Sequence, residues 1–175
     1  MYRLPAEWET HEATWITWPC RLSVWPNYAE TCQAYADVIN GIAQFEHVHL
    51  IVNPVHLAIA KTLCTAHNVS FIDNIHADDS WSRDTSPIFL KSAANLMATC
   101  WQFNAWGKKF HDYALDAQLA EKIAKHLGIK SQRETMVLEG GSIHTNGQGR
   151  LLTTKECLLN KNRNPHLSQS HIENQ

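Results

Sequence analysis

Residues 48–73, VHLIVNPVHLAIAKTLCTAHNVSFID, decide the fold class of this chain. Val48–Val52 is a short, continuous apolar run of the kind found in buried strands. Asn53 followed by Pro54 predicts a helix start with Asn53 as its capping residue, because proline is tolerated at the first helical position. A second apolar run, Val69–Asp73, comes after that helix. Two short apolar strands that bracket one helix predict a β-α-β unit with parallel strands, and therefore an α/β fold.

The same alternation extends toward the N-terminus. Ala13–Trp18 is rich in β-branched and aromatic residues, ends at Pro19, and is predicted to be a strand. Asn27 and Glu30 lie three residues apart and predict a helix start with Asn27 as its capping residue. Apolar residues then recur at helical spacing and predict one buried helix face, formed by Cys32, Tyr35, Ala36, Ile39, Ile42 and Ala43.

The C-terminal half shows a different order of elements. Neighbouring strands are predicted at Pro87–Lys91 and Leu96–Gln102, followed by a helix from about Leu115 to Leu127 that Gly128 terminates. The remaining predicted elements are a strand at Thr135–Leu138, a hairpin of Ser142–Thr145 and Arg150–Thr154 around Asn146-Gly147-Gln148-Gly149, and a helix begun within Leu167–Gln175. No linker divides the chain, so we expect a single domain over residues 1–175. Because the last helix lacks a capped end, we also expect that domain to be a fragment.

Composition narrows the function class. The chain is 44% hydrophobic and has a net charge of −2 with dispersed charges, so it is predicted to bind neither nucleic acid nor an acidic membrane. We find no membrane-span pattern and no signal-peptide core. The five cysteines include no Cys-x-x-Cys pair, which argues against a disulfide scaffold and a zinc site and favours the cytoplasm.

Two acidic segments carry the chemistry. Asp84 lies in the run Trp81-Ser82-Arg83-Asp84, and Glu139 begins Glu139-Gly140-Gly141; both are expected just after strands, where open α/β folds bind ligands. The two glycines permit close backbone approach or a positive φ beside Glu139. Two carboxylates beside aromatic residues and glycine suit a flat organic cation, because guanidinium donates in forks that match carboxylates.

Each of these residues also has a structural interpretation. Asp84 could form a turn, and Arg83 could pair with Asp84 or another acid. Trp81 and Trp106 could stack on a substrate or pack in the core. Asp78 and Asp79 are expected at the surface or as supporting groups, and the polar loop Asn160–Pro165 has no role assigned from sequence.

The chain resembles the N-terminal half of the family of agmatine deiminases and bacterial peptidylarginine deiminases, in the guanidino-modifying superfamily. The resemblance rests on ordered motifs over nearly the whole chain: Leu4–Trp15 (LPAEWETHEATW), Asp79–Thr85 (DSWSRDT), Phe103–Gly107 (FNAWG), Leu138–Ile143 (LEGGSI), Leu151–Asn160 (LLTTKECLLN) and Asn162–Leu167 (NRNPHL). Two positions depart from the family pattern, because Ser86 stands where glycine is usual and Lys161 where proline is common.

The resemblance implies a pentein-like fold, a partial pseudo-five-fold α/β propeller built from repeated ββαβ-type units. It implies that Asp84 and Glu139 hold a guanidinium that a cysteine thiolate attacks to give a thiouronium intermediate. Trp81, Trp106 and Arg83 are the expected substrate contacts, and no metal or organic cofactor is expected. The family's Gly-His-x-Asp and glycine-rich cysteine segments are not found in residues 1–175.

The chain alone is therefore expected to be inactive. Cys157, in a short apolar segment expected to be helical and buried, and His144 are both rejected as catalytic residues. The expected partner is a small cationic guanidino substrate, agmatine, with peptidyl-arginine as the alternative. A different class of function is a non-catalytic half-propeller that acts as a binding or interaction module. Exposed propeller edges predict self-association.

Overall fold

The β-α-β pattern of residues 48–73 lies in a three-stranded parallel sheet. In the computed structural model, which describes residues 1–174, this sheet contains β1 (Ala13–Thr17), β2 (His47–Ile51) and β3 (Val69–Ile72), in the order β1-β2-β3. The register pairs Trp15 with His49 and His49 with Ser70. The sheet belongs to a unit that spans Thr10–Ser82, and Met1–Glu9 together with the chain from Arg83 onward forms a second unit. The predicted α/β class and parallel pairing are confirmed.

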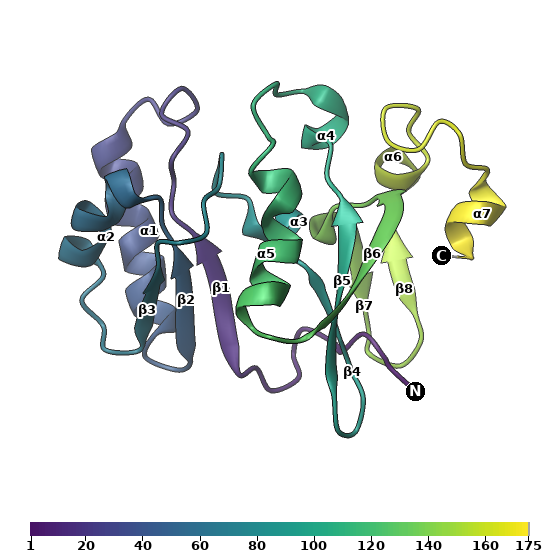
Figure 1. Ribbon diagram of the computed structural model, residues 1–175, viewed down its shortest axis with the longest axis horizontal. Helices are drawn as coiled ribbons and strands as arrows, with labels where there is room; N and C mark the ends of the chain where they lie inside the picture. Colours follow the sequence, from purple (N-terminus) through teal and green to yellow (C-terminus); the bar gives the residue numbers. More distant parts are fainter. Residues whose placement is uncertain (175) are drawn as a thin grey trace. The chain divides into compact units, whose positions relative to one another are not determined.

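Two helices cover the sheet of the first unit. They are α1 (Tyr28–Ile42) and α2 (Leu57–Leu63), the latter entered through a 3₁₀ turn at Pro54–His56 (Figure 1). Their apolar faces pack against alternate residues of the strands, which gives one buried cluster. Its fully buried members are Trp18, Cys32, Ala36, Ile39, Ala43, Val48, Leu50, Val52, Ala60 and Cys64.

The predicted capping chemistry of these helices is wrong. Asn27 occupies the N-terminal cap position of α1, but its side chain makes no capping hydrogen bond. Asn53 does not cap its turn either; its amide instead donates to the Ala77 carbonyl over 2.9 Å and accepts from the Ala77 N–H over 3.1 Å. A side-chain amide that pairs with both backbone groups of a distant residue satisfies them as a strand would.

The second unit contains a mixed sheet. Strands β4 (Ile88–Lys91) and β5 (Leu96–Gln102) pair antiparallel, and β6 (Lys130–Val137) joins β5 in parallel. Helix α5 (Leu119–His126), preceded by a 3₁₀ turn at Asp116–Gln118, packs on this sheet (Figure 1). Gly128 ends that helix with a φ of +64°, as its sequence position predicts. Strand β6 begins five residues earlier than predicted, because its first part is a polar, exposed edge without apolar alternation.

The rest of the second unit forms a separate layer of small elements. Strands β7 (Ile143–Thr145) and β8 (Leu151–Thr153) make the predicted hairpin. The short helices α6 (Lys155–Leu158) and α7 (Gln169–Glu173) follow. They share a core with β6 and the residues after it, formed by Met136, Leu138, Leu158 and Ile172. Gln175, which belongs to the predicted last helix, lies outside the described residues.

The N-terminal segment also belongs to the second unit. Arg3 forms an isolated antiparallel bridge with Lys91 of β4, and Glu9 contacts the side chains of both. Across residues 1–174, no helix is both long and apolar enough to cross a bilayer. The expectation of a single domain over residues 1–175 stays a prediction.

Candidate functional site

Glu139 and Asp84 lie at different places relative to the strands of the second unit's sheet: Glu139 follows a strand, whereas Asp84 precedes one. Strand β6 ends at Val137, and Glu139 follows it at the start of a 3₁₀ turn, Gly140–Ser142, with 3% of its surface exposed. Asp84 lies in the helical turn α3 (Ser82–Thr85), ahead of β4, and is partly exposed. The predicted position just after a strand is confirmed for Glu139. It is wrong for Asp84, because a long polar run separates Asp84 from β3.

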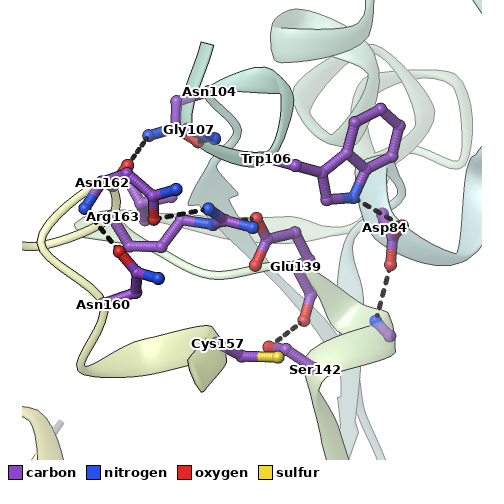
Figure 2. Close-up of polar contacts among 12 residues, drawn as sticks. Asp84, Asn104, Trp106, Gly107, Glu139, Ser142, Cys157, Asn160, Asn162 and Arg163 are labelled. Carbon is purple, nitrogen blue, oxygen red and sulfur yellow. Dashed lines mark hydrogen bonds and ion pairs between the residues drawn. The ribbon is translucent and has the colours of Figure 1, made fainter. Parts of the chain in front are cut away.

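The two acidic segments touch through the glycines that follow Glu139. The backbone N–H of Gly141 donates to Asp84 Oδ1 over 3.0 Å (Figure 2). A Cβ atom at Gly141 would overlap the same Asp84 oxygen, and one at Gly140 would overlap the backbone carbonyl oxygen of Arg83. Both positions therefore require glycine for the backbone to come this close. The predicted use of these glycines for close approach is confirmed.

Trp106 fixes the second oxygen of Asp84. Its indole Nε1–H donates to Asp84 Oδ2 over 3.1 Å, and its ring meets Phe103 edge-to-face at 5.1 Å between centroids. Each Asp84 oxygen thus accepts one hydrogen bond from a neutral N–H group. Within residues 1–174 no arginine, lysine or histidine forms an ion pair with Asp84. These donors orient the carboxylate without cancelling its charge.

The turn that carries Trp106 has unusual backbone angles. Within α4 (Ala105–Lys108), φ is +52° at Ala105, +55° at Trp106, +85° at Gly107 and +63° at Lys108. The left-handed conformation costs a non-glycine residue roughly 1–3 kcal/mol, so surrounding contacts must hold this turn. Asn104 supplies two of them: its side chain accepts from the Gly107 N–H over 2.8 Å and donates to the Asn162 carbonyl over 2.9 Å.

Glu139 has a cationic partner. Arg163 Nε donates to Glu139 Oε1 over 2.5 Å, and the two side chains are 10% and 3% exposed. Arg163 Nη1 also donates to the Asn162 side-chain oxygen over 2.8 Å. Ser142 Oγ donates to the Glu139 carbonyl over 2.6 Å. Glu139 is therefore a buried member of an ion pair, whereas Asp84 is a partly exposed carboxylate held by neutral donors. Figure 2 shows the contacts of both carboxylates.

The sequence did not assign a role to the loop that supplies Arg163. Asn164 is 4% exposed, and its side chain pairs with both the N–H and the carbonyl of Val137, each at 2.9 Å. Asn160 accepts from the Asn162 N–H over 3.0 Å. The density of asparagine and arginine in residues 160–164 was the available signal, because these side chains bind backbone groups and carboxylates far along the chain.

The predicted substrate contacts Arg83 and Trp81 have partners of their own. The Arg83 guanidinium forms an ion pair with Glu7 and is 58% exposed, so it pairs with an acid other than Asp84. Trp81 belongs to the unit of residues 10–82 and is 40% exposed. It stacks on Trp25 with a centroid separation of 6.4 Å. Substrate contact by either residue stays a prediction.

Three further residues can be placed. Cys157 is in the predicted helix, but it is partly exposed, and its neighbour Leu158 is the buried residue; the prediction of a core cysteine is therefore wrong at Cys157 itself. His144 is exposed and lies 3.8 Å from Glu7. Asp79 is not a surface residue: it is 2% exposed and pairs with Arg21 at 3.0 Å, because a carboxylate at this depth requires a partner.

Comparison with known proteins extends these observations. Agmatine deiminase from Pseudomonas aeruginosa is 41% identical to this chain over 179 residues, which cover 98% of this chain and 48% of that protein. The solved agmatine deiminase of Enterococcus faecalis matches with a TM-score of 0.93 and 32% identity, over 99% of this chain and 49% of that one. An agmatine deiminase from C. jejuni with substrate bound matches with a TM-score of 0.90 and 31% identity, over 99% and 52%.

The chain thus spans about half the length of the relatives it matches. The model of the Porphyromonas-type peptidyl-arginine deiminases matches residues 3–175, and so takes in both units and all of the candidate site residues. The chain therefore belongs to the Porphyromonas-type peptidyl-arginine deiminase family.

Proposed function

We propose that Asp84 and Glu139 form the carboxylate side of a guanidinium-binding site in an agmatine deiminase. A protein that contains this chain would convert agmatine and water to N-carbamoylputrescine and ammonia. The observation that carries the proposal is the hydrogen bond from Gly141 to Asp84, which joins the two acidic segments within one unit. The names of the relatives from P. aeruginosa and E. faecalis support agmatine as the substrate.

Asp84 is the stronger candidate for direct contact with the cation. Its carboxylate is partly exposed, and both of its donors, Trp106 and Gly141, are neutral. A carboxylate oxygen has capacity for a second hydrogen bond, so Asp84 can accept a guanidinium fork without losing either donor. Fixed orientation matters because the central carbon of a guanidinium is a poor electrophile and must be held in line with its attacker.

The proposed reaction balances without an external redox partner. A thiolate forms a bond to the guanidinium carbon, and ammonia leaves with a proton from a general acid, which gives an S-alkylthiouronium. Water then adds to the same carbon and the C–S bond breaks; one proton of the water restores the general acid and the other passes to the departing sulfur, so that the ureido product leaves and the thiol is regenerated. Asp84 and Glu139 serve here as binding groups, and the nucleophile and general acid are not assigned to any residue of this chain.

The other predicted contacts belong to the same proposal. The ring of Trp106 lies beside Asp84, where it can contact the substrate's alkyl arm while its N–H holds the carboxylate. Trp81 is 40% exposed, and an indole ring can bind a cation. Arg83 already pairs with Glu7, so its contribution would be to shape the charge around the site.

We also propose that the α/β fold seen here is part of a pseudo-five-fold propeller of ββαβ-type units, working in the cytoplasm. Strand β8 supports the accompanying prediction of self-association. Among residues 1–174 it pairs only with β7, and its residues Leu151 and Leu152 are 56% and 73% exposed. An open strand edge with exposed leucines favours pairing with another chain. Size-exclusion chromatography should show species larger than a monomer, and a stable monomer at all concentrations would contradict this part.

Titration calorimetry of this chain tests the binding proposal. Agmatine should bind, and putrescine, which has the same carbon chain but no guanidinium, should bind more weakly. An arginine-containing peptide is the third ligand and separates the peptidyl-arginine alternative, which the family's own description supports. No affinity for any guanidino compound would contradict the proposal and leave a non-catalytic interaction module. Ammonia assays should detect no turnover; turnover lost on Cys157→Ala would overturn the rejection of Cys157.

A further inference from the structure

We infer that Arg163 is a positioning residue: a guanidinium of the protein itself that stays paired with Glu139 while the substrate's guanidinium binds. Its Nε atom lies 2.5 Å from Glu139 Oε1. No other hydrogen bond to the Glu139 carboxylate occurs in the part of the chain that the structure describes. This inference deepens the proposed function and rests on it only for the part that concerns the substrate.

The loop around Arg163 is anchored on both sides of that residue. Before it, the Asn162 carbonyl accepts from Asn104, and the Asn162 side chain accepts from Arg163 itself. After it, Asn164 is fixed by its two hydrogen bonds to Val137, at the end of the strand that leads to Glu139. Arg163 and Glu139 are thus both held near the end of β6, Arg163 through its neighbour Asn164 and Glu139 by its place in the chain. Little conformational freedom therefore remains to be lost when the ion pair forms.

A dissolved guanidinium is a poor competitor for this position. Removing one partner of a buried ion pair leaves an uncompensated charge, and only 3% of Glu139 and 10% of Arg163 is exposed. Arg163 is also tethered beside Glu139, so its effective concentration there exceeds that of a ligand at millimolar concentration. Displacement of Arg163 by agmatine would bury a second cation next to it. The pair is therefore expected to persist in the complex.

Persistence of the pair changes the role of the two carboxylates. Glu139 and Arg163 together are neutral, so the negative charge of this part of the site comes from Asp84. One net negative charge matches one guanidinium, whereas two unpaired carboxylates would not. Arg163 already occupies one hydrogen-bonding position of the Glu139 carboxylate, so Glu139 can accept from the substrate only at the positions that remain. We therefore expect Asp84 to make the bidentate contact with the substrate's guanidinium. This assignment predicts an order of importance for binding that the sequence alone does not give.

The first test is chemical rescue, and it does not require that the chain bind agmatine. Arg163→Ala should lower the melting temperature by about 6–20 °C, the range expected for a broken buried pair in a chain of this size. Guanidinium chloride at 20 mM should then raise it in a saturable way, because a ligand that fills the vacated position stabilises the folded state. Sodium chloride and methylammonium chloride at the same concentration should not.

Matched variants separate positioning from general loss of charge. Arg133→Ala removes an exposed arginine that pairs with Glu121, and it should show neither the large fall nor the rescue. The double variant Arg163→Ala with Glu139→Gln should show no rescue, because the carboxylate that attracts guanidinium is gone. Equal rescue of the wild type, of Arg133→Ala or of the double variant would overturn the inference.

The second test follows Arg163 directly and remains available if Arg163→Ala does not fold. The Arg163 Nε–H should give a slowly exchanging NMR signal, assigned by its loss in Arg163→Lys. That signal should persist at saturating agmatine; collapse or rapid exchange on binding would show displacement and overturn the inference. If agmatine does not bind at all, the proposed function fails, while the rescue experiment still decides the role of Arg163.

Discussion

Asp84 and Glu139 look equivalent in the sequence, but their surroundings in the fold are opposite. Asp84 is partly exposed and is held by an indole N–H and a backbone N–H. Glu139 is almost fully buried and is paired with the guanidinium of Arg163. Neutral donors fix a carboxylate's direction and leave its charge for a ligand, whereas a cationic partner neutralises it. The comparison separates a carboxylate suited to binding from one suited to supporting the site.

The largest expected effect follows from removing the charge of Glu139. Glu139→Gln should lower the free energy of unfolding by about 3–5 kcal/mol, because Arg163 then remains buried without its counter-ion. Urea denaturation measures the change. The matched control is Glu121→Gln, which breaks an exposed pair with Arg133 and should cost less than about 1 kcal/mol. Equal effects of Glu139→Gln and Glu121→Gln would show that the Glu139 pair behaves like an exposed one, and Glu139 would then no longer differ from Asp84 as a buried, paired carboxylate.

The next effect concerns ligand binding at Asp84. Asp84→Asn should weaken agmatine binding roughly 10- to 100-fold, because a charge-assisted hydrogen bond contributes about 1.5–3 kcal/mol. An amide also offers only one acceptor, so either Trp106 or Gly141 would face an NH₂ group. Calorimetry with Asp37→Asn, an exposed charge removal on α1, is the control. Unchanged affinity in Asp84→Asn would show that Asp84 is not the binding carboxylate.

A smaller effect is expected from the contact that joins the two segments. Gly141→Ala should lower the free energy of unfolding by about 1–3 kcal/mol, because the new Cβ would overlap Asp84 Oδ1 and part of the site must move. Gly41→Ala is the control: Gly41 lies in α1 with no atom near its Cβ position, so alanine there should be neutral or slightly stabilising. A fully tolerated Gly141→Ala would show that the close approach is dispensable.

The smallest expected effect comes from Glu9, a partly exposed carboxylate that contrasts with the buried Glu139. Arg3 and then Lys91, with the Ala6 N–H, hold the pKa of Glu9 well below its usual range. Because the pKa of Glu9 is lower in the folded state, its ion pairs stabilise the fold above the unfolded-state pKa near 4.5. This stabilisation is lost as the pH falls from there toward the folded-state pKa. The urea concentration at the midpoint of unfolding should therefore decrease when the pH is lowered from 5 to 3. The decrease should be slightly smaller in Glu9→Gln. Identical pH profiles would show that this surface cluster contributes nothing.

The unit of residues 10–82 could be predicted largely from local patterns. Its strands are short runs rich in apolar, β-branched and aromatic residues and its long helix has an apolar face, so these patterns locate both. The failures there concern side-chain hydrogen bonds, because Asn53 binds Ala77 rather than its own helix start. Nothing in the local sequence distinguishes those two uses of an asparagine.

The second unit was harder to predict, since polar residues decide its site. The first residues of β6 have no apolar alternation, so the strand was located too late in the chain. The sequence indicates both acidic residues and the glycine pair as candidates, because charge and backbone freedom are readable from residue type, and the role of the two acids stays a prediction. Arg163 and Asn164 were missed as members of the site, because their partners lie 24 and 27 residues away along the chain.

The resemblance to a known family selected Asp84 and Glu139 as the candidate acids, and their role stays a prediction. The sequence by itself determined the α/β class, the parallel β-α-β pattern and the hairpin turn. These features follow from hydrophobic period and turn chemistry, both of which are local properties. Tertiary structure alone decided which acid is neutralised and which keeps its charge. A carboxylate's electrostatic role depends on burial and on the groups within a few ångströms of it, and folding supplies both from distant parts of the chain.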